Sequence, residues 1–212
     1  DKLLTAGAET IYMVCISLFI GAIIAFPLAI LLYLTRKNGM YQNRFVNGLL
    51  NIIINVIRST PFIIMLVCVM PLTKVLVGTR IGTKAALVPL TIYIAPYLAR
   101  LMEGALLETK AGIIEAAEAM GAKPLQIVWH FILPESLGSL ILTITTGTIG
   151  LIGATAMAGY IGGGGIGNIA LTYGYQQFNN RLMFFTVLIL IIVVQLIQNL
   201  GTWASAKIRR AR

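Results

Sequence analysis

The chain has 212 residues, of which 58% are hydrophobic and 11% charged, and its mean hydropathy is +0.90. Soluble domains carry roughly 25% charged residues, so this composition excludes an ordinary water-soluble globular fold. The net charge of +9 comes from Lys and Arg in short clusters between apolar stretches. That distribution is typical of membrane proteins in contact with lipid head groups and speaks against nucleic-acid binding.

Five apolar stretches predict an all-α helix bundle that crosses the membrane five times. The first, Ile11 to Leu34, has no charged residue and as a helix reaches about 36 Å, enough to cross a bilayer. We place the spans of a single transmembrane domain, residues 1–212, at about 11–34, 45–72, 85–106, 137–158 and 182–206.

The second span is interrupted by Arg58-Ser59-Thr60-Pro61. An arginine facing lipid at the bilayer centre costs at least roughly 2.5–3.5 kcal/mol, so we expect Arg58 to face the bundle interior or to reach the head groups. Pro61 lacks an N–H and predicts a bend. Two interpretations remain open, a purely structural bend or a place where Thr60 and Pro61 line the translocation pathway and Arg58 contacts substrate.

The basic clusters predict the orientation of the chain. The positive-inside rule places both 36–44 and 207–212 in the cytoplasm. Five spans satisfy both demands with the N-terminus outside and the C-terminus inside, although the basic loop 74–84 then faces outward against the trend. The polar segment 107–135 is therefore predicted to be cytoplasmic.

This segment predicts two short helices joined at a tight corner. The first is a run of small residues from Ala111 to Met120, and Gly121 is suited to the left-handed position that ends a helix. Pro124 is suited to the first turn of the second helix, which we expect to end at Leu133-Pro134.

The corner also offers apolar side chains, Met120, Ile127 and Trp129, as contact area for a partner protein. An ordinary helical loop at the membrane interface is the alternative that the residues alone leave open.

Several residues of the corner resemble the signature of the permease subunits of bacterial ABC importers. The matching positions are Glu115, Ala116, Ala117, Gly121, Leu133 and Pro134, while Phe131 stands where that signature has an aliphatic residue. In that family the loop forms coupling helices that sit in a cleft of a cytoplasmic ATPase subunit. The resemblance implies that these six residues and Met120 form an ATPase-docking surface.

The chain is also similar to the methionine-uptake permeases, in residues 58–64, 86–91 and 112–116 and in the glycine-rich stretch after Met157. These are five-span subunits of type I importers in the bacterial inner membrane. They work as homodimers with an ATPase dimer and a methionine-binding lipoprotein. The resemblance implies D- and L-methionine as substrates, with ATP and Mg on the partner ATPase. Polar amino-acid permeases carry a similar Arg-x-Thr-Pro element, so another amino acid is the alternative.

The sequence contains no motif that would let the chain drive transport by itself. It has no G-x-x-x-x-G-K-[ST] phosphate loop, so we expect neither ATP binding by that route nor enzymatic activity. None of the seven acidic residues lies in the middle of a predicted span, which speaks against a stand-alone proton- or sodium-coupled carrier. A membrane scaffold without transport activity is a third possibility that no feature favours.

No cofactor or metal is expected on this chain. The run Gly162–Gly167 formally fits G-x-G-x-x-G, but no acidic residue follows that could bind a ribose. We expect instead a flexible or tightly packed outward loop over 159–180. Cys15 and Cys68 fall in apolar runs and His130 is the only histidine, a pattern that predicts no metal site.

The fourth span is unusually rich in Thr and Gly. Small residues recur every four positions, at Thr146, Gly150, Ala154 and Ala158. This stripe predicts close helix packing, and hydroxyls such as that of Thr155 could instead line the pathway. Met157 follows as either a core side chain or a soft apolar gate.

The fifth span carries a polar stripe that predicts contact with another helix, formed by Gln195, Gln198, Asn199 and Thr202.

Overall fold

The computed structural model describes residues 2–210, which are helical almost throughout and contain no β-strand. Asp1, Ala211 and Arg212, the last a member of the basic C-terminal cluster, lie outside the described residues. The helices in chain order are α1 (Lys2–Thr35), α2 (Arg44–Ser59), α3 (Phe62–Cys68), α4 (Met70–Val77), α5 (Thr83–Leu107), α6 (Ala111–Ala119), α7 (Pro124–Ile127), α8 (Leu133–Ala158), α9 (Ile166–Ile169) and α10 (Asn180–Arg210).

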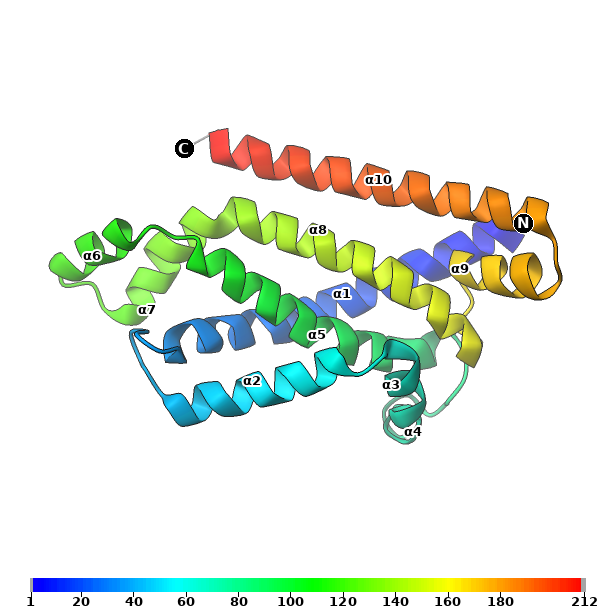
Figure 1. Cartoon of the computed structure of the whole chain (residues 1–212), viewed down its shortest axis with the longest axis horizontal. Coiled ribbons are helices and arrows are strands. Elements are labelled where there is room, and N and C mark those ends of the chain that lie inside the picture. The colour runs from blue at the N-terminus through cyan, green and yellow to red at the C-terminus, as the bar shows by residue number, and fades with distance from the viewer. Residues whose placement is uncertain (1, 211–212) are drawn as a thin grey trace.

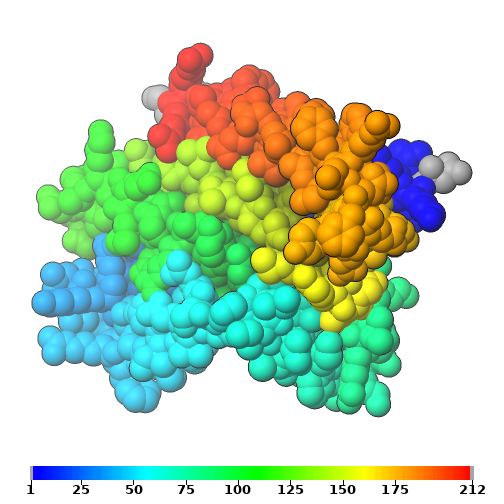
Figure 2. Space-filling view, turned by 45° about the vertical axis from the view of Figure 1, so that its right-hand side comes forward, coloured from blue at the N-terminus to red at the C-terminus, as the bar shows by residue number. Residues whose placement is uncertain are grey.

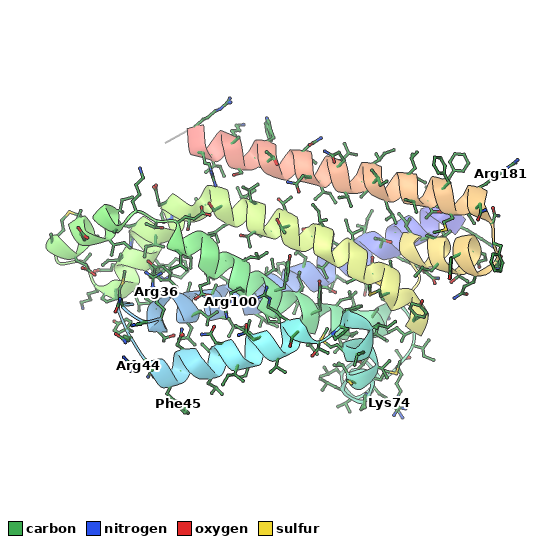
Figure 3. The ribbon with its side chains drawn as sticks, in the orientation of Figure 1. Arg36, Arg44, Phe45, Lys74, Arg100 and Arg181 are labelled. Atoms are coloured by element: carbon green, nitrogen blue, oxygen red, sulfur yellow. The ribbon has the colours of Figure 1, made fainter. Side chains whose placement is uncertain are left out.

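The long helices run alongside one another, and the short helices gather at the two ends of the bundle (Figure 1). The N-terminus lies at the end that carries α9, and the C-terminus lies toward the end that carries α6 and α7. Arg36 and Arg44 mark the α6–α7 end and Lys74 and Arg181 the opposite end, with Arg100 between them (Figure 3).

The predicted all-α polytopic bundle is confirmed. Within residues 2–210, α1, α5, the helix that includes α8, and α10 are each long and apolar enough to cross a membrane. The pair α2 and α3 passes the same test together, although it is bent by 104°. Five crossings result if this bent pair counts as one, and its helices form one edge of the molecule in Figure 2.

The bend predicted at Pro61 within the second span is confirmed, and it is sharp enough to divide the span into two helices. The chain leaves helical geometry at Thr60, whose φ and ψ are −79° and 123°, because a residue before proline is pushed toward extended backbone. Pro61 then begins α3 in a new direction. The hydroxyls of Ser59 and Thr60 both donate to the Val56 carbonyl, which gives this oxygen at the end of α2 two hydrogen bonds.

The predicted end of a short helix at Leu133-Pro134 is also wrong, because one helix continues from Pro124 to Ile161. A π-helical turn over Val128–Ile132 makes this possible. The Leu133 N–H reaches back five residues to the Val128 carbonyl. Pro134 then follows directly after this irregular turn, at the second position of α8.

At three close contacts between long helices, glycine leaves the space that a side chain of the neighbouring helix fills. A Cβ at Gly21 of α1 would collide with Ile94 of α5, one at Gly147 of α8 with Leu98 of α5, and one at Gly201 of α10 with Thr145 of α8. Small residues let helix backbones approach in a membrane, where van der Waals packing replaces the hydrophobic effect as the driving force.

The stripe predicted in the fourth span divides into two parts. Ala154 and Ala158 are buried, as close packing requires, whereas Thr146 is exposed and a Cβ at Gly150 would meet only the Tyr93 hydroxyl, at 4.0 Å.

The glycine-rich segment is packed and largely helical. A 3₁₀ turn over Gly159–Ile161, the short α9 and a π-helical stretch over Ala170–Gln176 follow one another. The carboxylate of Glu9 accepts a hydrogen bond from Gly165 N, and Thr10 Oγ1 accepts one from Ile166 N. Of the two loop states predicted, the tightly packed one is correct.

Candidate functional site

The corner between α6 and α7 is closed by a specific backbone motif. Gly121 adopts a φ of +78°, and its N–H bonds to the Glu118 carbonyl while the Ala122 N–H bonds to the Ala117 carbonyl. This pair of bonds is the Schellman arrangement, which satisfies carbonyls that the end of α6 would leave open. The left-handed role predicted for Gly121 is confirmed.

The next helix is started by Lys123 and Pro124. The Lys123 N–H donates to Oε1 of Gln126, 2.8 Å away, and Pro124 occupies the first turn of α7. With one helix end and one helix start fixed by local hydrogen bonds, the corner is a rigid feature and not a loose loop.

The outer surface of the corner is apolar with acidic side chains beside it. Met120, Leu125 and Trp129 are 70%, 54% and 55% exposed, and Leu125 and Trp129 stand one helical turn apart. Glu115, Ala116 and Gly121 are exposed as well. Exposed large apolar side chains beside charged ones, on a rigid support, are typical of a protein-docking surface.

Three residues predicted for this surface are instead buried, namely Ala117, Ile127 and Leu133. Ala117 and Ile127 join the main core cluster, which places α6 against the start of the helix that continues into α8. Their side chains fix the two helices relative to each other and are not available to a partner. Pro134 is half-buried within that continuous helix.

The first loop of the chain lies beside α6. Arg36 and Gly39 line a cavity of about 270 Å³ together with Ile114, Glu115 and Glu118. The Arg36 guanidinium stacks over the ring of Tyr33, 4.2 Å from its centroid. A basic loop therefore faces the acidic side of the corner.

Near the corner, the ends of α5, α8 and α10 are joined to one another by hydrogen bonds. Ser139 of α8 donates to the Glu108 carboxylate just beyond α5, and Arg209 of α10 donates to Ser139 Oγ at 2.9 Å. Ser205 donates to the Gly138 carbonyl at 2.8 Å. The corner itself is connected to these ends through the helix that continues from Pro124 into α8.

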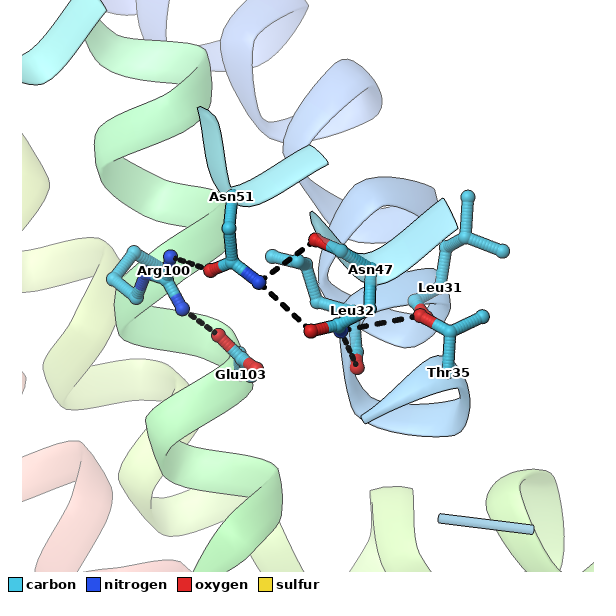
Figure 4. A network of polar contacts seen from close by, with 7 residues as sticks. All are labelled: Leu31, Leu32, Thr35, Asn47, Asn51, Arg100 and Glu103. Carbon is cyan, nitrogen blue, oxygen red and sulfur yellow. Dashed lines mark hydrogen bonds and ion pairs between the residues drawn. The ribbon is translucent and has the colours of Figure 1, made fainter. Parts of the chain in front are cut away.

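A second polar network lies deeper in the bundle and joins α1, α2 and α5 (Figure 4). Arg100 pairs with Glu103 at 2.7 Å and also donates to Asn51. Asn51 donates to Asn47, and Asn47 donates to the Leu32 carbonyl. Glu103 is only 7% exposed, and Arg100 is its ion-pair partner in this buried position.

The residues predicted for a pathway or gate do not all share one environment. Met157 is 43% exposed, Pro61 is exposed and Thr60 is half-buried. Thr155 is buried and its hydroxyl donates to the Ile152 carbonyl, so within this chain it presents no free hydroxyl, and its role in the pathway stays a prediction. The hydroxyls that α8 does present belong to its other face, as at Thr146.

Among residues 2–210 there is no group of three or more His, Cys, Asp and Glu side chains placed to hold a metal ion. His130 is exposed and its Nδ1 lies 3.1 Å from the Gln126 carbonyl of its own helix.

Apolar crossings, a bent second crossing and a corner of short helices at one end define a polytopic helical membrane protein. The chain belongs to the family of binding-protein-dependent transport system inner membrane components, whose model matches residues 17–210. It is accordingly a multi-pass protein of the bacterial inner membrane.

Curated relatives cover almost the whole chain. It is 44% identical over 210 residues to the probable D-methionine transport system permease protein MetI of Vibrio cholerae, covering 99% of this chain and 92% of that one. It is also 44% identical over 200 residues to the methionine import system permease protein MetP of Bacillus subtilis, covering 94% and 90%.

Solved structures agree with this assignment. A chain of the MetNI methionine ABC transporter, in an inward-facing conformation, matches with a TM-score of 0.94 at 43% identity, covering 98% of this chain and 96% of that one. An amino acid ABC transporter solved with histidines has the same fold, with a TM-score of 0.79 at 16% identity, covering 97% and 93%.

Proposed function

We propose that this chain is the membrane-spanning subunit of an ATP-driven importer of methionine, and that the α6–α7 corner docks on a separate cytoplasmic ATPase. The observation that carries the docking proposal is the exposure of Met120, Leu125 and Trp129 on a corner whose backbone is held by hydrogen bonds. The substrate proposal rests on relatives named for methionine transport at 44% identity.

The proposed complex contains two copies of this chain, two ATPase subunits that bind ATP and Mg, and an external lipoprotein that delivers substrate. The polar stripe on α10 supports contact with a second copy, because Gln195 and Asn199 bond only within their own helix among the described residues. The fold supports an orientation with the N-terminus outside, since the corner and the C-terminus share one end of the bundle (Figure 1).

Coupling would proceed through the corner as a rigid body. Closure of the ATPase dimer on ATP would move the corner, and the continuous helix from Pro124 would carry this motion into α8. The bonds of Ser139 and Ser205 would pass it on to α5 and α10. The chain itself supplies the pathway and no chemistry.

The test is reconstitution of the full complex in proteoliposomes, with and without the ATPase. The proposal expects methionine uptake only when ATPase, ATP and loaded binding protein are all present. Uptake by this chain alone would favour a stand-alone carrier, and uptake of a different amino acid in preference would reject methionine as the substrate.

Two double variants test the docking surface independently of the substrate. Met120→Glu with Leu125→Glu is expected to abolish co-purification of the ATPase while leaving the permease folded. The matched control is Val75→Glu with Leu76→Glu in α4, two side chains at the opposite end that are 82% and 64% exposed. If the control pair disrupts the complex equally, the corner has no special role in docking.

A further inference from the structure

Arg58 occupies an unusual position near the end of α2, just before the break at Thr60. Its side chain is exposed, and its guanidinium lies over the ring of Tyr97, 5.9 Å from the centroid. Tyr97 is about 21 Å from the Thr83 end of α5 and about 15 Å from the Leu107 end, at 1.5 Å per residue. The charge of Arg58 therefore lies beside the middle part of a membrane-crossing helix, well away from both helix ends.

No carboxylate among residues 2–210 lies within ion-pair distance of Arg58. The contrast with Arg100 is direct, because Arg100 has both Glu103 and Asn51 as partners. The backbone break is not held by Arg58 either, since Ser59 and Thr60 satisfy the Val56 carbonyl and Pro61 sets the direction of α3. An unpaired guanidinium at this depth needs an anion or water, and a structural role leaves it unexplained.

An aromatic wall stands beside Arg58. Tyr97 stacks against Tyr93 with centroids 6.1 Å apart, and Tyr93 meets the edge of Phe62 at 5.3 Å. On the far side the Tyr93 hydroxyl lies about 4.0 Å from where a Cβ of Gly150 would be. Side chains from α2, α3 and α5 thus converge opposite an uncrowded part of α8.

The backbone at this place is irregular at membrane depth. Thr60 and Pro61 are not in a helix, and Pro61 is exposed. Non-helical backbone is tolerated within a bilayer only where protein covers it or where it lines a water-filled space. Protein does not cover Pro61 within this chain, so in the assembled transporter the break faces either the second copy or a water-filled space.

We propose that Arg58 binds the carboxylate of the transported amino acid inside the membrane, while Tyr93 and Tyr97 pack against its side chain. The inference rests on the proposed import function and adds a substrate site to it. A guanidinium donates two parallel hydrogen bonds to a carboxylate, and a thioether packs favourably against aromatic rings. The site would recognise the amino-acid backbone charge through Arg58 and the apolar side chain through the tyrosines.

The test uses the complex of full-length permease and ATPase in nanodiscs, without binding protein, and measures equilibrium binding by calorimetry. The two probes are L-methionine and L-methioninamide, which differ in the carboxylate. Arg58→Gln is expected to weaken L-methionine binding about tenfold or more and to leave L-methioninamide within about twofold. Lys74→Gln, an exposed cation of α4, is the matched control and should change neither.

Arg58→Lys keeps the charge without the planar fork, so it gives a second variant if Arg58→Gln fails to assemble. It is expected to bind L-methionine less tightly than wild type and L-methioninamide equally well. The proposal is overturned if the wild-type complex binds no L-methionine, if both probes weaken equally, or if the Arg58 variants bind like wild type.

Failure of this site is distinguishable from failure of the import function. Methionine uptake by the complete wild-type system tests the function, whatever Arg58 does. If uptake is normal in both wild type and Arg58→Gln, the importer stands and the Arg58 site is rejected. If wild type takes up no methionine, the proposed function itself fails.

Discussion

The carboxylate of Glu9 accepts a hydrogen bond from the backbone N–H of Gly165 at 2.8 Å, across 156 residues of chain. This contact joins the first helix to the glycine-rich segment that follows the fourth crossing. Oγ1 of Thr10, the next residue, accepts a second hydrogen bond from the Ile166 N–H at 2.9 Å. The end of the bundle opposite the corner is therefore held together by α1.

Removal of this carboxylate should loosen that end. Glu9→Ala is expected to lower stability by about 1–3 kcal/mol, since it leaves the Gly165 N–H without its charged acceptor. Glu9→Gln keeps an acceptor oxygen and should lose less. Thermal unfolding in detergent measures both, and an unchanged midpoint for Glu9→Ala would show that the bond contributes nothing.

Close packing of α10 on α8 gives a second prediction. Gly201→Ala places a methyl group against the Thr145 side chain and should destabilise the chain by about 1–3 kcal/mol. Gly153→Ala in α8 is the matched control, because a Cβ there meets no atom within 4 Å. Thermal unfolding of the two variants should separate them, and equal midpoints would contradict the packing.

The backbone of the corner can be tested at Gly121. Gly121→Ala forces a side chain into the left-handed region at φ +78°, which costs about 1 kcal/mol or more. We expect weaker stimulation of ATP hydrolysis by the loaded binding protein, because the corner changes shape. Gly112→Ala within α6 has free space for its Cβ and should leave stimulation unchanged. A loss in both variants would show general disruption instead.

The Arg100 network should behave as a coupled unit. Glu103→Ala leaves Arg100 unpaired beside Asn51 and is expected to destabilise the chain by about 1–3 kcal/mol. Arg100→Gln combined with Glu103→Gln should lose less than the sum of the two single changes, because neither variant residue carries an unpaired charge. Additive effects in unfolding measurements would show that the two residues do not interact.

Features set by composition or by local backbone needs could be predicted from the sequence. The crossings follow from long apolar runs, and the helix end at Gly121 follows from a requirement for positive φ that glycine meets best. Pro124 at a helix start has the same local origin. These features depend on few residues, all close in the chain.

Features set by packing between distant segments could not be predicted. The bond between Arg100 and Asn51 spans 49 residues, and no spacing in the sequence indicates it. The helix is predicted to end at Leu133-Pro134, but it continues through a π-helical turn at Val128–Ile132 that no sequence pattern indicates. The burial of Ala117 and Ile127 and the exposure of Leu125 depend on how α6 rests against the following helix, which hydropathy alone does not fix.

The central claim, that the α6–α7 corner docks on a partner ATPase, is tested most directly by site-specific cross-linking. Met120→Cys would be introduced after Cys15 and Cys68 are replaced by serine, with Val75→Cys at the opposite end as the control. The account predicts a cross-link from position 120 to the ATPase whose yield changes with ATP, and none from position 75. Absence of the cross-link at position 120, or equal yields at the two positions, would contradict it.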